Sequence, residues 1–262
     1  MKETLLYADL SWKEMAEAVA SQRIVILPIG STEQHGPHLP LCTDDYMAQR
    51  WAFESARLAK ESFGVQSLVM PGLHYGNAQH HMGFTGTVSL SFETLKNITV
   101  EIGKSVLSHG FRKLVLLNVH GGNRYAVRAA AVELGMAQGN GGLPLYIRVV
   151  EDCDPDINPL KLDYDKLKGF TEEASLGSMV HGGALETSKM VYLRSDLVDL
   201  NRIQEKPASS RGSTREVFPY HILTPTGAMG NPLEATKEAG KVLWEALVLH
   251  FAEYLRELSK KP

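Results

Sequence analysis

The chain has 262 residues, of which 44% are apolar and 22% are charged, and its formal net charge at pH 7 is −3. These values are ordinary for a globular protein with a large core, so we predict a single domain over residues 1–262. The weak negative charge argues against a nucleic-acid or anionic-membrane partner. No apolar run reaches the roughly 20 residues of a membrane span, and two cysteines without a Cys-x-x-Cys motif are typical of a reducing cytoplasm.

Short apolar runs bounded by turn residues predict strands, and longer amphipathic segments predict helices. Along the chain, strands are expected at 24–29, 65–70, 113–117 and 145–150. Helices are expected at 11–21, 45–61, 91–109, 124–137, 183–193 and 233–258. Ser11 and Glu14 have the spacing of a capping box, and Ser91 is a candidate N-cap. Residues 152–178 and 196–231 are expected to be mostly loop.

Strands and helices alternate through the first half of the chain. This alternation predicts an α/β fold, a three-layer α/β/α sandwich with a mostly parallel central sheet. In such sheets ligands bind beyond the carboxyl ends of the strands. The loops after the first three strands, at 30–44, 71–90 and 118–123, all carry histidines. Chain order alone therefore predicts that these loops meet at one edge of the sheet.

The loop after the first strand is dense in side chains that bind metals. It carries Glu33, His35, His38, Asp44 and Asp45, and its prolines restrict the backbone. We expect His38 to orient a metal ligand rather than to bind metal. We expect Asp45 to be a favourable charge at a helix N-terminus.

Carboxylate and imidazole ligands together suit zinc, manganese or iron(II) better than magnesium or calcium. Asp44 could bridge two such ions, and a metal-bound hydroxide between them would be a nucleophile for amide hydrolysis at neutral pH. A serine hydrolase is an alternative, because His-Gly-Gly resembles a lipase oxyanion turn, but the chain has no Gly-x-Ser-x-Gly elbow. A non-catalytic metal-binding protein is another, although structural zinc sites favour cysteine-rich shells.

Three stretches of the sequence resemble the creatininase (creatinine amidohydrolase) family. They are Gly-Ser-Thr-Glu-Gln-His-Gly-Pro-His-Leu-Pro at 30–40 with Asp44, His-Gly-Gly-Asn at 120–123, and His-Gly-Gly-Ala-Leu-Glu-Thr-Ser at 181–188. The resemblance covers nearly the whole chain. It implies an α/β/α fold, a hydrolase of non-peptide C–N bonds in small or cyclic amides, and two divalent ions, zinc with zinc, manganese or iron. It also implies a homo-oligomer, often a hexamer.

The resemblance assigns roles to individual residues of this chain. The implied metal ligands are Glu33, His35, Asp44 and His120, with Asp44 as the bridge. The implied general acid–base is His181.

Other positions depart from creatininase itself. Creatininase has a metal-binding glutamate where this chain has Gly122, so Glu186 is our candidate for the replacement ligand and for a catalytic role. His81 and Asn123 are our candidates for substrate contact.

The positions that close over the substrate also differ. Creatininase has two tryptophans that cover creatinine, whereas the matching positions here fall near Glu151 and Ser178. We therefore predict a small amide other than creatinine as the substrate. The His-Gly-Gly-Asn turn also resembles branches of the family that act on formamides of nucleotide precursors or on a peptide C-terminus, and both are alternatives.

Overall fold

The structure is a computed structural model that describes residues 4–136, 144–152, 169–171, 180–203 and 219–262. The loop expected at 152–178 therefore lies largely outside the described residues. The same holds for Ser178 and for part of the loop expected at 196–231.

Parallel strands form the central sheet, in the order β2–β1–β3–β4. They are β1 (Ile24–Ile29), β2 (Ser67–Val69), β3 (Lys113–Asn118) and β4 (Tyr146–Glu151). Val25 of β1 lies opposite Leu114 of β3, and Leu114 lies opposite Ile147 of β4. These strands confirm the predicted ones, although β2 is shorter than predicted.

The helices also match segments predicted as helical. They are α1 (Trp12–Ala20), α2 (Thr43–Phe63), α3 (Phe92–Ser108), α4 (Arg124–Met136), α8 (Ala184–Arg194) and α10 (Lys237–Ser259). The capping box at Ser11 forms, and the Ser91 hydroxyl accepts a hydrogen bond from the first turn of α3. α10 begins later than predicted, because a separate 3-10 turn, Pro232–Glu234, precedes it. Within the described ranges, no helix combines the length and the apolarity that crossing a membrane requires.

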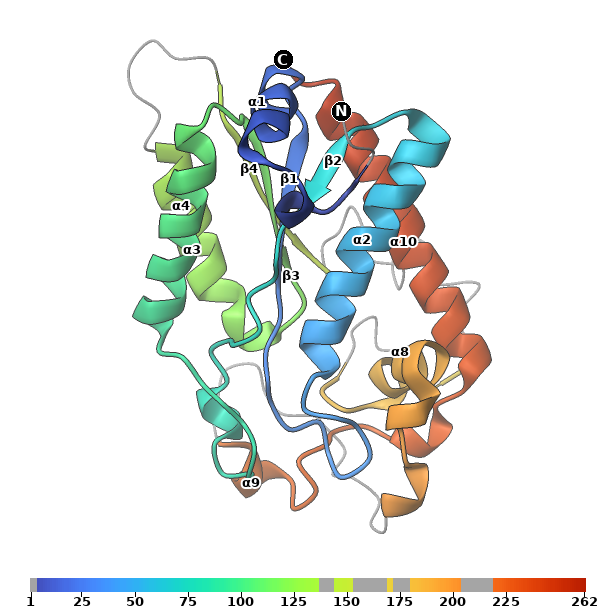
Figure 1. Cartoon of the computed structure of the whole chain (residues 1–262). Coiled ribbons are helices and arrows are strands. Elements are labelled where there is room, and N and C mark those ends of the chain that lie inside the picture. Colours follow the sequence, from blue (N-terminus) through green and yellow to red (C-terminus); the bar gives the residue numbers. More distant parts are fainter. Residues whose placement is uncertain (1–3, 137–143, 153–168, 172–179, 204–218) are drawn as a thin grey trace.

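Strand side chains alternate between two apolar layers. In β1, Ile24 and Ile26 pack with α2 and α10, whereas Val25 and Leu27 pack with α1, α3 and α4. Figure 1 shows the sheet between α3 and α4 on one side and α2 and α10 on the other. The predicted α/β fold with helices on both faces of a parallel sheet is confirmed.

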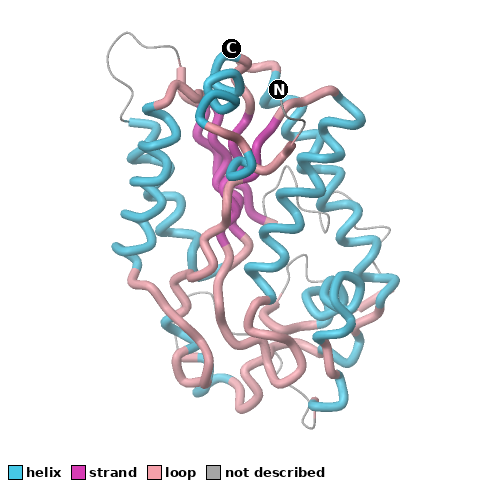
Figure 2. The backbone as a smooth tube through the Cα atoms, viewed as in Figure 1, coloured by secondary structure: helices cyan, strands magenta, loops and turns pink. Residues whose placement is uncertain are grey.

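The strand order puts β1 and β3 side by side, although β2 lies between them in the chain. The chain leaves β1 toward one edge of the sheet and β3 toward the other, and such a switch opens a crevice at the carboxyl ends of the strands. The two strand ends are tied there, since Val119 donates its N–H to the carbonyl oxygen of Ile29 (3.1 Å). Figure 2 shows loops gathered beyond this end of the sheet.

The contact between α8 and α10 leaves no room for a side chain at Gly240. A Cβ atom there would overlap the backbone carbonyl of Ser188 in α8. We expect Gly240→Ala to lower the free energy of unfolding by about 1–3 kcal/mol, the usual cost of overpacking. Urea denaturation measures this change.

Gly135 in α4 is the matched control, because no described group outside the backbone of its own helix and its chain neighbours lies within 4 Å of a Cβ built there. Gly135→Ala should leave the free energy of unfolding unchanged or raise it by up to about 1 kcal/mol, since alanine favours a helix. Equal effects of the two substitutions would contradict the packing argument.

Candidate metal centre

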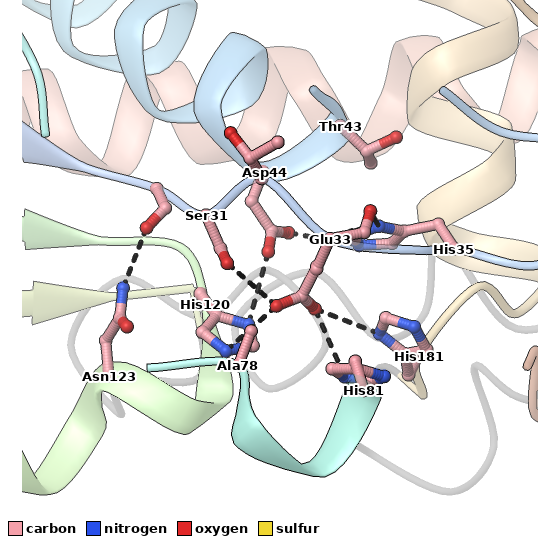
Figure 3. A network of polar contacts seen from close by, with 12 residues as sticks. Ser31, Glu33, His35, Thr43, Asp44, Ala78, His81, His120, Asn123 and His181 are labelled. Carbon is pink, nitrogen blue, oxygen red and sulfur yellow. Dashed lines mark hydrogen bonds and ion pairs between the residues drawn. The ribbon is translucent and has the colours of Figure 1, made fainter. Parts of the chain in front are cut away.

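Buried carboxylates and imidazoles from separate segments meet at the carboxyl ends of β1 and β3 (Figure 3). Glu33 and His35 come from the loop after β1, Asp44 comes from the first turn of α2, and His120 follows β3. Their exposed fractions lie between 0% and 4%. The structure therefore brings together the residues that the sequence analysis assigned to the metal shell.

Glu33 lies at the centre of the cluster. Its Oε2 is 3.0 Å from Nε2 of His120, and its Oε1 is 3.2 Å from Nε2 of His81. Ser31, two residues earlier, donates its hydroxyl to Oε2 (2.8 Å). These contacts hold the Glu33 carboxylate in one orientation, with Oε2 facing His120 and Oε1 facing His81.

Asp44 lies between two imidazoles. Its Oδ1 is 3.2 Å from Nε2 of His35, and its Oδ2 is 3.2 Å from Nδ1 of His120. Each oxygen therefore faces a different histidine, which is the geometry of a carboxylate that can bridge two ions.

The start of α8 brings Glu186 and His181 to the same centre. Oε2 of Glu186 is 3.6 Å from Nε2 of His35 and accepts a hydrogen bond from the N–H of Gly182 (2.7 Å). Nδ1 of His181 is 3.6 Å from Oε1 of Glu33. Glu186 thus lies beside His35, and His181 lies near both Glu33 and His35, with its ring centroid 4.3 Å from that of His35.

The donor set of this cluster fits divalent cations. Among the described residues, the buried atoms without a hydrogen-bond partner include Oε1 of Glu33, Nε2 of His35 and Oδ2 of Asp44. Buried polar atoms are rarely left unpaired, so three of them together indicate a cation site. Ligand atoms of these residues lie within 4.8 Å of one another, as do those of His35, His181 and Glu186. Carboxylate with imidazole is the ligand set of zinc and manganese.

The contacts in the cluster shift the pKa values of its members. Burial disfavours a charged imidazole, but the carboxylates of Asp44, Glu186 and Glu33 outweigh it and raise the pKa of His35 to about 10. Burial is likewise outweighed at His120, where Glu33 and Asp44 hold the pKa well above its ordinary value. At Asp44, burial alone would raise the pKa, but His35 and His120 hold it below its usual range. The carboxylates therefore create a strong demand for positive charge at this place.

At His181, His81 and Glu186 the pKa shifts favour the neutral form of the side chain. Burial, and then the charge of His35, holds the pKa of His181 well below its ordinary value. Burial and the neighbouring histidines, His181 first, lower the pKa of His81 as well. Burial raises the pKa of Glu186. The centre thus combines imidazoles that attract protons with imidazoles that stay neutral.

The expectation that Asn123 contacts substrate finds no support in this geometry. Its Oδ1 accepts a hydrogen bond from the N–H of Asn77 (2.7 Å), and its Nδ2 donates to the carbonyl oxygen of Gly30 (2.9 Å). The side chain is fully buried. Asn123 therefore ties the loops after β1 and β2 to the turn after β3, because both ends of its amide are used by backbone.

The space beyond Gly122 is filled in this chain. A Cβ there would overlap the carbonyl oxygen of Asn77 and Nε2 of His120, and would lie 2.8 Å from Cε1 of His80. The ring of His80 is stacked on that of His120, with centroids 5.7 Å apart and an interplanar angle of 5°. A glutamate cannot be accommodated at this position without displacing these groups.

Sequence reasoning did not single out Gln34 or Tyr220. Nε2 of Gln34 is 2.7 Å from Nδ1 of His81 and 3.0 Å from Nε2 of His181. The ring of Tyr220, in the short helix α9 (Tyr220–Leu223), packs edge-on at 4.2 Å from His81 and 5.2 Å from His181 between centroids. Gln34 could have been found from its place between two ligands, whereas no motif marks Tyr220.

Other polar residues of the first loop point elsewhere. Nε2 of His38 is 2.9 Å from the hydroxyl of Thr187 in α8, which links the ligand loop to that helix. Asp45 turns away from the cluster, with Oδ1 2.8 Å from Nδ1 of the exposed His74. Adjacent carboxylates at 44 and 45 thus have different surroundings.

Comparison with known proteins agrees with this geometry. The family model described as creatininase, creatinine amidohydrolase, matches residues 8–255. A creatinine amidohydrolase of Pseudomonas putida is 31% identical, with 98% of each chain covered. A mycofactocin precursor peptide peptidase of Mycobacterium tuberculosis is 30% identical over 90% of this chain and 87% of its own.

Solved structures give the same result. Creatininase with manganese superposes with a TM-score of 0.78 at 30% identity, covering 98% of this chain and all of that one. A creatininase variant of the Zn–Zn type superposes with a TM-score of 0.75 at 29% identity, covering 99% of this chain and all of that one. These neighbours hold the metals that the donor set of the present chain suits.

Asp44→Asn tests the bridging position. The amide keeps the shape of the carboxylate but removes the negative charge that would hold two cations, so we expect the metal content to fall to one ion per chain or less, with loss of hydrolysis. Metal analysis of the purified protein by mass spectrometry measures this.

Asp45→Asn is the matched control, because the neighbouring carboxylate faces His74 and not the cluster. It should keep the metal content of the unmodified protein. Full occupancy by two ions in Asp44→Asn would show that Asp44 is not the bridge.

Proposed function

The chain belongs to the creatininase family of metal-dependent hydrolases, and from that premise we propose that it hydrolyses a non-peptide C–N bond of a small or cyclic amide at a dinuclear metal site. The observation that carries this proposal is the position of Asp44, whose two oxygens face two different histidines, each at 3.2 Å. A single carboxylate whose oxygens face two ligand sets can bridge a pair of cations, and paired cations of this kind occur in hydrolases.

The two ions would be held by two overlapping sets of ligands. One set is Glu33, His120 and Asp44, and the other is Asp44, His35 and Glu186. Glu186 supports the second set by lying 3.6 Å from His35, and its backbone hydrogen bond from Gly182 fixes its orientation. It would supply the carboxylate that Gly122 does not.

Two divalent ions, when bound, would activate a water molecule at neutral pH and polarise the amide carbonyl. The chain's own contribution is proton transfer. His181 lies beside this centre with Nδ1 facing Glu33, where it would take a proton from the attacking water and give it to the leaving nitrogen. The C–O bond forms, the C–N bond breaks, and no covalent enzyme intermediate is needed.

Creatinine is not the substrate that these residues favour. Glu151, near one of the tryptophan positions, is 3% exposed, and its carboxylate accepts hydrogen bonds from Asn118 (3.1 Å) and Arg128 (2.7 Å). A buried, paired carboxylate cannot cover an apolar ring as a tryptophan does. The glycine at position 122, where creatininase has a glutamate, also argues against creatinine as the substrate.

A second candidate is hydrolysis at a peptide C-terminus. Two guanidinium groups, of Arg124 and Arg128, lie around Glu151 at the end of β4, with contacts of 3.3 and 2.7 Å. Guanidinium groups bind carboxylates in charge-assisted hydrogen bonds, so their presence at the end of β4 would favour a substrate that bears a carboxylate. The relative that acts on the mycofactocin precursor peptide makes this candidate chemically concrete.

A formamide of a nucleotide precursor stays the third candidate. The single-domain organisation and the homo-oligomer also stay predictions.

A hydrolysis screen separates these candidates. The protein loaded with zinc or manganese should release product from a small cyclic amide, a formamide or a peptide C-terminus at least about tenfold faster than from creatinine, a difference of about 1.4 kcal/mol in activation free energy. Mass spectrometry of the reaction mixtures measures the products. Creatinine turnover as fast as that of the best alternative would overturn the substrate proposal.

Substitutions in α8 and before it separate the two proposed roles. Glu186→Gln should lose one ion per chain, whereas His181→Ala should keep both ions and lower kcat by about 10², the usual scale for a general acid–base. Metal analysis and steady-state kinetics measure the two effects.

The controls are Glu238→Gln, an exposed glutamate in the first turn of α10, and His109→Ala, an exposed histidine at the end of α3. Both should match the unmodified protein. If Glu186→Gln kept two ions and a normal rate, the second ion would need another ligand.

A further inference from the structure

The amide of Gln34 has a single possible orientation. Its side chain is 5% exposed, Oε1 lies 2.9 Å from the backbone N–H of Gly36, and Nε2 lies 3.0 Å from the carbonyl oxygen of Gly227. A backbone N–H can only donate and a carbonyl oxygen can only accept. The oxygen of the amide must therefore face Gly36, and one N–H must point to Gly227.

The backbone is shaped to make these contacts. Gly36 and Gly227 have backbone φ values of +74° and +80°, which residues other than glycine rarely adopt. A Cβ at Gly227 would overlap the oxygen of the Gln34 amide. The fixed amide orientation thus depends on glycine at Gly227.

The second N–H of the Gln34 amide determines which nitrogen of His81 carries the proton. Nε2 of Gln34 is 2.7 Å from Nδ1 of His81, so Nδ1 must accept this hydrogen bond. A neutral imidazole with an accepting Nδ1 carries its proton on Nε2. This Nε2–H lies 3.2 Å from Oε1 of Glu33, so His81 presents a donor to the centre.

His181 is fixed in the same tautomer, but its unprotonated nitrogen, and not its N–H, faces the centre. Its Nε2 is 2.7 Å from the backbone oxygen of Gln34, which can only accept, so this nitrogen carries the proton. The Gln34 amide, 3.0 Å away, has no third hydrogen to offer it. The lone pair of His181 is then on Nδ1, on the side of Glu33.

We propose that Gln34 is a positioning residue that divides the two histidines into a hydrogen-bond donor, His81, and a proton acceptor, His181. The division rests on the proposed function and deepens it. His181 accepts the proton of the attacking water at Nδ1, while Nε2–H of His81 stabilises the oxygen of the amide carbonyl as negative charge develops on it. The ring of Tyr220 packs against both imidazoles and opposes their rotation.

Gln34→Glu keeps the shape of the side chain, reverses the hydrogen bond at His81 and removes the donor that faces the carbonyl oxygen of Gly227. A carboxylate oxygen facing Nδ1 accepts where the amide donated, so Nδ1 of His81 must carry a proton. We expect the metal content to stay unchanged and kcat to fall at least tenfold. In the zinc-loaded protein, the ¹⁵N signal of His81 Nδ1 should change from the unprotonated to the protonated type, with His81→Ala used for assignment.

Three further variants make the test specific. Gln34→Met keeps an unbranched side chain but has no donor, and Gly227→Ala displaces the amide without adding charge; both should lower kcat at unchanged metal content. Gln79→Glu is the matched control, because Gln79 is exposed two residues before His81 and gains the same charge. It should match the unmodified protein in rate and in spectrum.

The inference fails if His81 of the unmodified protein carries its proton on Nδ1, or if Gln34→Glu changes neither the spectrum nor kcat. The spectrum requires no turnover, so it decides the tautomers whether or not an amide is hydrolysed. Absence of hydrolysis with the expected spectrum would overturn the proposed function alone. Hydrolysis with the opposite tautomer would overturn this inference alone.

Discussion

The burial of two carboxylates, Glu33 and Asp44, is the constraint on which the site depends. Each is almost completely removed from water, and each lies within 3.2 Å of two imidazoles. A buried carboxylate costs several kcal/mol unless positive charge or hydrogen bonds compensate it. The segments after β1, β2 and β3 supply that compensation through His35, His81 and His120, and divalent ions would complete it. This demand explains why so much of the polar chemistry of the chain is gathered at one place.

The sheet makes this gathering possible. Because β1 and β3 are neighbours, the loops that carry Glu33 and His120 start side by side. Asn123 then joins these loops to the one after β2 by hydrogen bonds to Gly30 and Asn77. Such hydrogen bonds help to hold the loops in one arrangement, and a metal centre needs this support because its ligands must stay within about 0.5 Å of the productive geometry.

The expected differences from creatininase itself lie both in the centre, at Gly122, and around it. His80 and the carbonyl of Asn77 fill the space next to Gly122, and Glu151 forms a polar cluster with Asn118 and Arg128 near one expected tryptophan position. The shared ligands support the same hydrolytic chemistry, and the altered surroundings change what can bind over it.

The sequence by itself determined the strands and most helix limits, because apolar periodicity and capping are local. Chain order placed the histidine-bearing loops at one edge of a parallel sheet, and the resemblance to the creatininase family implied Glu33, His35, Asp44 and His120 as the metal ligands, which stays a prediction. Only the tertiary structure showed the contacts of Gln34, Tyr220 and Asn123. Gln34 meets Gly227, 193 residues away, and Asn123 meets Gly30, 93 residues away. The direction of a hydrogen bond depends on which backbone group lies opposite an amide, and residue type and spacing carry no information about that.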